Sequence, residues 1–190
     1  MEELKLVKNL AFGEDARSQI LTGVDKLTHA VASTLGASGK CVILEDKNGK
    51  PIITKDGVTV ANAVTLQSPL ENIGATLIKE AAQRTVQDAG DGTTTATVLA
   101  KAILDEANKH DELETSRSIK DGIHTGVNKV VKQLEKRSKK VKGDKINQVA
   151  TISANNDHEL GKIIGEAFKM VDETGVVMME INEDPETTVE

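Results

Sequence analysis

The sequence predicts a mainly α-helical fold with one small β-hairpin. Apolar residues recur at steps of three and four along several long segments, which is the spacing of one helix face. The Asn48-Gly49 pair lies between two short apolar runs and indicates a hairpin turn. The aromatic residues are Phe12 and Phe168 alone, so we expect Ala, Val, Ile and Leu to form the core.

Length and composition are those of a globular protein of one or two domains. The chain has 190 residues, a formal net charge of −6 and 38% hydrophobic residues. No apolar run approaches the roughly 20 residues that span a bilayer, and the charged N-terminus lacks the apolar segment of a signal peptide. The lone Cys41 cannot form an intramolecular disulfide, which favours a reducing, cytoplasmic location. The negative charge and scarce aromatics argue against nucleic acid as a partner, and no membrane partner is expected.

The first predicted elements are a helix and the hairpin. The helix covers Arg17–Thr34, with Asp15 as its expected N-cap and Gly36 just beyond its end. The hairpin strands are Cys41–Leu44 and Pro51–Thr54.

Helices dominate the middle of the chain. The apolar spacing predicts a short helix over Val58–Val64 and longer ones over Glu71–Asp88, Thr93–Lys109 and Ser116–Arg137. A polar loop is expected over His110–Thr115.

The last part of the chain begins with a basic connection. Six of the eleven residues of Glu135–Lys145 are basic, and we interpret them as a solvated helix end and loop rather than a nucleic-acid patch. After Ile146–Ala150, Asn156 or Asp157 is expected to cap a helix that runs to Gly175. A strand is predicted over Val176–Ile181.

The stretch Gly90–Thr97, of sequence Gly-Asp-Gly-Thr-Thr-Thr-Ala-Thr, carries the most chemical information. It joins the end of one helix to the start of another, where free N–H groups and the helix dipole attract phosphate. Two glycines allow close approach, and Asp91 could hold a Mg²⁺ ion that bridges phosphate oxygens. An ordinary Asp/Thr cap would explain one or two of these residues. The pattern is not a Walker A loop, because no Gly-x-x-x-x-Gly-Lys-Ser/Thr is present.

Three other loops are weaker candidates. Thr34–Lys40 is a small-residue loop that a plain helix stop also explains. In Thr54–Gly57, Lys55 could bind a phosphate and Asp56 could orient a water, although a turn with a surface ion pair is the simpler interpretation. Helix capping accounts for most of Thr151–Asp157. The four histidines show no metal-ligand spacing.

The residues around Gly90–Thr97 closely resemble the signature of the group I chaperonins. The resemblance extends over residues 7 to 182 and is carried by several motifs in family order. These are Phe12–Arg17, Thr34–Gly36, Ile53–Val58, Glu71–Ala75, Ala89–Leu99 and Thr151–Asn155.

The resemblance implies the fold, the activity and the partners. It implies the N-terminal half of an equatorial ATP-binding helical bundle over 1–137, with a small edge hairpin that adds to a neighbouring subunit's sheet. The first segment of an α/β intermediate domain would follow over 138–190, and the apical domain is absent. The implied protein is an ATPase that assists protein folding as a homo-oligomer of stacked rings. Its implied partners are unfolded client proteins and a co-chaperonin.

The resemblance also implies site residues for ATP, Mg²⁺ and K⁺. Asp91 would hold Mg²⁺, Asp56 would be the acidic catalytic residue beside the γ-phosphate, and Thr34, Lys55 and Thr94 would lie near K⁺. The implied ATP-binding residues are Thr34, Leu35, Gly36, Lys55, Asp56, Gly57, Gly90, Gly92, Thr93, Thr94, Thr95, Ile152 and Ser153.

Two departures from the family leave alternatives open. The family usually has Gly-Pro-Lys-Gly where this chain has Gly36-Ala37-Ser38-Gly39, and we expect a looser, less charged loop. The 190 residues also lack the segment that carries the family's principal catalytic aspartate. A fragment, a naturally short relative, and a truncated, non-catalytic assembly or interaction protein all remain compatible with the sequence. An unrelated phosphate-binding enzyme, such as a small kinase, is disfavoured by the missing Walker lysine.

Overall fold

The computed structural model describes residues 10–36, 38–46, 48–110, 114–171 and 175–180. The chain divides into two compact units, residues 1–125 and 126–190. Within the described residues it forms seven helices and a two-stranded antiparallel sheet. The mainly α-helical prediction is therefore confirmed.

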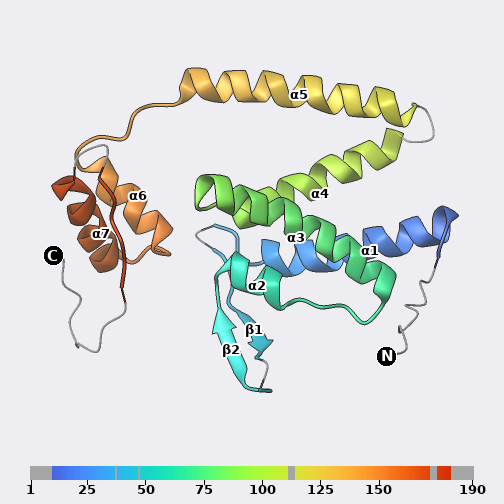
Figure 1. Ribbon diagram of the computed structural model, residues 1–190, viewed down its shortest axis with the longest axis horizontal. Helices are drawn as coiled ribbons and strands as arrows, with labels where there is room; N and C mark the ends of the chain where they lie inside the picture. The colour runs from blue at the N-terminus through green and yellow to red at the C-terminus, as the bar shows by residue number, and fades with distance from the viewer. Residues whose placement is uncertain (1–9, 37, 47, 111–113, 172–174, 181–190) are drawn as a thin grey trace, which may run out of the picture. The chain divides into compact units, whose positions relative to one another are not determined.

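The core of the first unit lies among three long helices, which Figure 1 shows side by side. They are α1 (Gly13–Ala32), α3 (Pro69–Ala89) and α4 (Thr93–His110). The short helix α2 (Gly57–Ala63) packs against the same core. The buried side chains are aliphatic, as predicted: Val24, Leu27, Val31, Val60, Ala61, Ala75 and Ile78.

Two glycines allow α1 and α3 to pack closely. A Cβ on Gly23 of α1 would lie 1.8 Å from the carbonyl oxygen of Glu71, and a Cβ on Gly74 of α3 would lie 2.0 Å from that of Ile20. An ion pair joins the same helices, with the Lys26 Nζ atom 2.6 Å from a Glu71 carboxylate oxygen. The backbones therefore approach more closely than any side chain would allow.

The predicted hairpin is formed by β1 (Val42–Glu45) and β2 (Pro51–Thr54). Its register pairs Ile43 with Ile53, and both side chains are exposed. Val42 and Leu44 alternate with them and pack against the core. At the turn Gly49 has φ 78°, the left-handed conformation that the Asn-Gly signal predicts.

The remaining helices are α5 (Ser116–Arg137), α6 (Lys145–Ser153) and α7 (His158–Met170), and α5 runs across the boundary between the units. In the second unit α6 and α7 pack together through small residues, since a Cβ on Gly161 would lie 2.5 Å from the Thr151 Cα atom. Asp157 caps α7 by accepting hydrogen bonds from the N–H groups of Glu159 and Leu160. Among the described residues, no helix is both long and apolar enough to cross a membrane.

Four local predictions were wrong. Helix α7 ends at Met170 rather than running to Gly175, because the backbone is already extended at Val171. Helix α1 begins at Gly13 rather than after Asp15, because Glu14 and Asp15 occupy its first turn, where acidic side chains interact favourably with the helix dipole. Thr151, Ile152 and Ser153 belong to α6 rather than to a polar loop, because the apolar spacing from Ile146 continues the helix. Residues 176–180 form no strand, since no described strand pairs with their backbone groups, and Ile181 lies outside the described residues.

Candidate functional site

Three loops that are far apart in the sequence meet at Gly57, the first residue of α2. Gly57 is buried, and a Cβ built on it would lie 2.1 Å from the Thr94 Oγ1 atom and 3.5 Å from the Thr34 Oγ1 atom. Only glycine allows α2 to begin so close to the Thr94 hydroxyl. The loop after α1, the turn after β2 and the start of α4 therefore come together at one place.

The connection from α3 to α4 is a tight turn with two glycines at positive φ. Gly90 ends α3 with φ 75°, and its N–H donates to the Val86 carbonyl at 2.7 Å. Gly92 has φ 95°, and its N–H donates to the Asp91 Oδ1 atom at 2.6 Å. The first N–H groups of α4 have no acceptor within the helix, and the positive end of its dipole lies here. The Asp91 side chain is exposed beside these donors, within reach of an ion.

The consecutive threonines at the start of α4 differ in their surroundings. Thr93 is 6% exposed, and its Oγ1 atom is buried with no hydrogen-bond partner among the described residues. Thr94 is half-buried against Gly57, whereas Thr95 is exposed. A buried hydroxyl without a protein partner is uncommon, and in proteins such a group often binds a water or a ligand. Of the three, the structure thus singles out Thr93 as the residue whose hydroxyl lacks a partner among the described residues.

The loop after α1 is folded back on itself. Gly36 has φ 75°, and its carbonyl accepts the Gly39 N–H at 2.9 Å. A Cβ on Gly39 would lie 2.2 Å from the Thr34 carbonyl oxygen, so glycine is required there too. Leu35 is 46% exposed and free to contact a ligand. Gly39 was not among the predicted site residues, because its role depends on a close approach that spacing alone does not reveal.

Asp56 is the N-cap of α2. Its carboxylate accepts hydrogen bonds from the Val58 N–H, the Thr59 N–H and the Thr59 hydroxyl. Partial burial acts to raise the pKa of Asp56, but these hydrogen bonds outweigh it and hold the pKa below its ordinary value. The carboxylate is therefore ionised at neutral pH. Thr59 was also missed: Asp56 is a recognisable N-cap residue, but no sequence signal identified the Thr59 hydroxyl as its partner.

The other predicted site residues are Lys55, Ile152 and Ser153. Lys55 is exposed between β2 and α2, next to Asp56. Ile152, which is 68% exposed, and Ser153 lie in α6 of the second unit. The structure thus brings Thr34, Gly57 and Thr94 together.

A magnesium ion at this site would need water and phosphate oxygens for most of its coordination. Among the described residues, no group of three or more His, Cys, Asp or Glu side chains could hold a metal ion. Mg²⁺ commonly binds through one or two carboxylates, with water and phosphate oxygens completing its octahedron. Asp91 as a single carboxylate beside the N-terminus of α4 fits that pattern.

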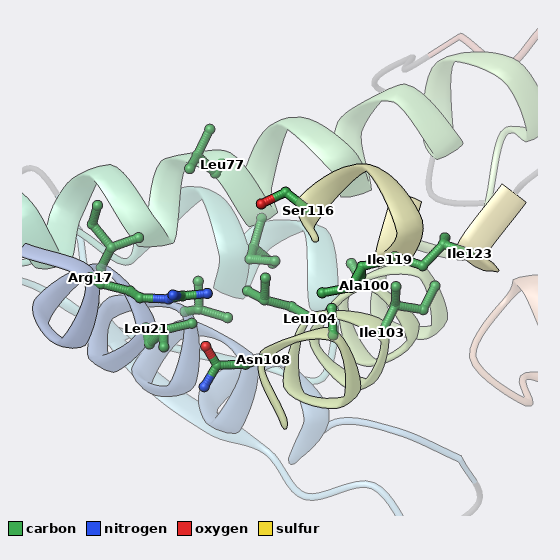
Figure 2. Close-up of a pocket in the computed structure, with 14 residues that line it drawn as sticks. Arg17, Leu21, Leu77, Ala100, Ile103, Leu104, Asn108, Ser116, Ile119 and Ile123 are labelled. Atoms are coloured by element: carbon green, nitrogen blue, oxygen red, sulfur yellow. The ribbon is translucent and has the colours of Figure 1, made fainter. Parts of the chain in front are cut away.

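A second feature of the first unit is an apolar groove of about 790 Å³. Side chains from α1, α3, α4 and α5 line it, and Figure 2 shows among them Leu21 of α1, Leu104 of α4 and Ile119 of α5. Leu77 of α3 and Ile103 of α4 also line it and are 55% and 42% exposed. An exposed apolar concavity of this size is typical of a surface that another polypeptide segment covers.

The chain is similar to known proteins in both sequence and structure. Residues 27–187 match the family model described as the TCP-1/cpn60 chaperonin family. The chaperonin gp146 of bacteriophage EL 2 (Pseudomonas aeruginosa), crystallised in the presence of ATP-BeFx, is 29% identical with a TM-score of 0.70, and the match covers 81% of this chain and 28% of that one. A group III chaperonin in the open state is 28% identical with a TM-score of 0.67, over 82% of this chain and 31% of the other. The chain thus spans less than a third of the length of either protein.

Proposed function

Since this chain belongs to the TCP-1/cpn60 chaperonin family, we propose that the loops around Gly57 bind Mg-ATP as part of a chaperonin subunit that assists protein folding. The observation that carries the proposal is the meeting of Thr34, Gly57 and Thr94 from three separate loops. That meeting places the start of α4, with its unpaired N–H groups, beside two other predicted binding loops.

Each residue has a proposed role that follows from its position. The N–H groups and hydroxyls of Thr93, Thr94 and Thr95 hold the phosphates, and Gly90 and Gly92 allow the backbone to approach them. Asp91 would hold Mg²⁺, which would supply positive charge to offset that of the phosphates. Asp56, ionised beside them, orients a water near the terminal phosphate.

The remaining predicted residues complete the proposed site. Leu35 and Gly36 line the nucleotide, and oxygens of Thr34, Lys55 and Thr94 surround K⁺. Ile152 and Ser153 approach from the intermediate segment, which we assign to 138–190 after an equatorial portion over 1–137.

The proposal extends to the type of chaperonin, its oligomeric state, its location and its partners. The motifs favour the group I type, a homo-oligomer of stacked rings in the cytoplasm, with unfolded proteins as clients and a co-chaperonin as partner. ATP hydrolysis, ring assembly and client binding belong to the whole protein, of which relatives are about three times as long as this chain.

Calorimetry on the 190-residue chain tests the proposal. We expect ATP to bind only when Mg²⁺ is present, and Asp91→Ala to weaken binding at least tenfold, because one charge-assisted metal or hydrogen-bond contact is worth about 1.5–3 kcal/mol. Asp88→Ala is the matched control: Asp88 is exposed near the end of α3, so this variant removes a nearby charge without removing a proposed ligand. A folded chain that binds no nucleotide, or equal losses in the two variants, would count against the site.

The apolar groove supports a second candidate, a non-catalytic assembly or interaction protein. The exposed Ile43–Ile53 pair on the hairpin also supports this candidate, since an unpaired strand edge with apolar side chains is a template for pairing with another chain. In that case the chain would associate with other subunits and bind no nucleotide.

A further inference from the structure

The two oxygens of the Asp56 carboxylate are held very unevenly. Oδ2 accepts the Thr59 hydroxyl at 2.6 Å and the Thr59 N–H at 2.8 Å. Oδ1 accepts the Val58 N–H at the longer distance of 3.2 Å. Short hydrogen bonds to an ionised oxygen are the stronger ones, so Thr59 dominates the orientation of this side chain.

This asymmetry leaves one oxygen available. An ionised carboxylate has about four lone-pair sites, and two of those on Oδ2 are used by Thr59. Oδ1 accepts only the longer Val58 bond and keeps one lone-pair site, and the Asp56 side chain is exposed to solvent. A ligand or an ordered water beside α2 would therefore meet Oδ1 rather than Oδ2.

The backbone of Asp56 is fixed on both sides, so the side-chain torsion is its main freedom. The Asp56 N–H donates to the Thr54 Oγ1 atom at 3.0 Å, which ties it to the end of β2. The next residue, Gly57, is buried against Thr94. Three hydrogen bonds restrain that torsion, and the one donated by the Thr59 hydroxyl is the shortest of them.

We propose that Thr59 is a positioning residue of the nucleotide site, whose hydroxyl holds Oδ2 of Asp56 so that Oδ1 is presented to the terminal phosphate or to its water. This inference rests on the proposed function and deepens it. The Thr59 side chain is itself exposed on α2, and its N–H bond to Asp56 does not depend on the side chain. Its hydroxyl can therefore be removed while the backbone cap stays in place.

The test compares Thr59→Val with Thr59→Ser in the binding of two nucleotides. Valine has the shape of threonine without the hydroxyl, whereas serine keeps the hydroxyl. We expect Thr59→Val to weaken the magnesium complex of the β,γ-imido ATP analogue about fivefold, the factor for one net hydrogen bond, and to leave Mg-ADP within about twofold. Thr59→Ser should bind both nucleotides as the parent chain does.

Two further variants separate positioning from a general loss of stability. Thr76→Val is the matched control, because the exposed Thr76 hydroxyl donates to the Asn72 carbonyl at 2.8 Å within α3, away from the site. In an Asp56→Ala background, Thr59→Val should have no further effect, as a double-mutant cycle requires when one residue acts through the other.

The outcomes are distinguishable. Equal weakening of both nucleotides by Thr59→Val, a serine variant that behaves like valine, or a valine effect that persists without Asp56 would overturn the role of Thr59 and leave the proposed function standing. A parent chain that binds neither nucleotide would overturn the proposed function and the nucleotide role of Thr59 with it.

Discussion

Gly57 is the residue on which the candidate site depends most directly. Its missing side chain creates the space that the Thr94 hydroxyl occupies, since a Cβ would come within 2.1 Å of the Thr94 Oγ1 atom. The Thr34 hydroxyl lies on the same side, and itself donates to the Val31 carbonyl at 2.8 Å. A single methyl group at position 57 would therefore displace the Thr94 hydroxyl from its place between the loops.

We expect Gly57→Ala to impair the site more than the fold. The Thr94 side chain can rotate away from the new methyl group, so the free energy of unfolding should fall by no more than about 2 kcal/mol. Mg-ATP binding should weaken at least tenfold, because the Thr94 hydroxyl no longer lies where the phosphates are proposed to bind. Calorimetry and thermal unfolding of the same sample would measure both quantities.

Gly122→Ala provides the control for this prediction. Gly122 lies in α5, and no atom lies within 4 Å of the position that a Cβ would take, so alanine there should be neutral or stabilising. If Gly57→Ala binds Mg-ATP as tightly as Gly122→Ala, Thr94 does not contribute to binding in the way proposed.

At this scale the sequence predicted the types of residue better than their contacts. Asp56 was expected to orient a water, and the structure adds that it caps α2 through Val58 and Thr59. The Thr93 hydroxyl was expected among the phosphate contacts, and the structure shows it buried without a partner in the described part of the chain. These details depend on which atoms lie nearby after folding, so spacing alone did not reveal them.

The packing of α1 on α3 shows how strongly one element constrains another. The two helices touch backbone to backbone, because Gly74 lies against the Ile20 carbonyl and Gly23 against Glu71. Backbone atoms cannot rotate away as a side chain can. Both positions must therefore stay glycine for this crossing to exist.

Gly74→Ala should destabilise the protein severely. The new Cβ would lie 2.0 Å from the Ile20 carbonyl oxygen, so the helices must separate and lose contacts around Val24 and Ala75. We expect the free energy of unfolding to fall by about 3 kcal/mol or more, the upper range for overpacking a core. Chemical denaturation followed by circular dichroism would measure the loss.

Gly126→Ala is the matched substitution in an open environment. Gly126 lies in α5 with no neighbouring atom within 4 Å of an added Cβ, so alanine should stabilise the helix by about 0.5–1 kcal/mol. A Gly74→Ala variant as stable as Gly126→Ala would show that the close crossing of α1 and α3 is not maintained in solution.

Helices were predicted more accurately than the last strand. The expected Ser116–Arg137 helix matches α5 residue for residue, and the strand Pro51–Thr54 matches β2. A helix satisfies its own backbone hydrogen bonds, so its signal is local. A strand needs a partner, and for residues 176–180 the described part of the chain contains none.

The apolar groove is the feature of the first unit that most affects the behaviour of the molecule as a whole. Leu77 and Ile103 are half-exposed on its walls, although both belong to helices whose other faces form the core. Figure 2 shows that Ile119 and Ile123 of α5 extend the same apolar lining. Water contact with so much aliphatic surface favours association with another polypeptide segment.

We expect the 190-residue chain to self-associate as its concentration rises, and the double variant Leu77→Gln/Ile103→Gln to reduce that association. Both side chains are already about half exposed, so the double substitution should cost no more than about 2 kcal/mol of stability. Sedimentation velocity over a range of concentrations would follow the shift from larger species toward the 20.3 kDa monomer.

Val130→Gln/Leu134→Gln is the control for the groove. These side chains are 59% and 61% exposed on α5, outside the groove. The control therefore replaces two exposed apolar side chains with glutamine, as the groove variant does, but leaves the groove intact. Identical behaviour of the two double variants, or a parent chain that stays monomeric throughout, would refute a specific role for the groove.

The amino-acid sequence by itself determined the helical class, the hairpin, the aliphatic core and the chaperonin-like stretch Gly90–Thr97. Each of these depends on local signals: helical periodicity, the Asn48-Gly49 turn, cap residues and consecutive small and polar residues. Folding in three dimensions decided where separate segments touch. The meeting of Thr34, Gly57 and Thr94, the backbone contact of Gly74 and the groove between α1, α3, α4 and α5 all join residues distant along the chain. Such contacts depend on how whole helices and strands pack around a shared core, and local sequence patterns do not predict that packing.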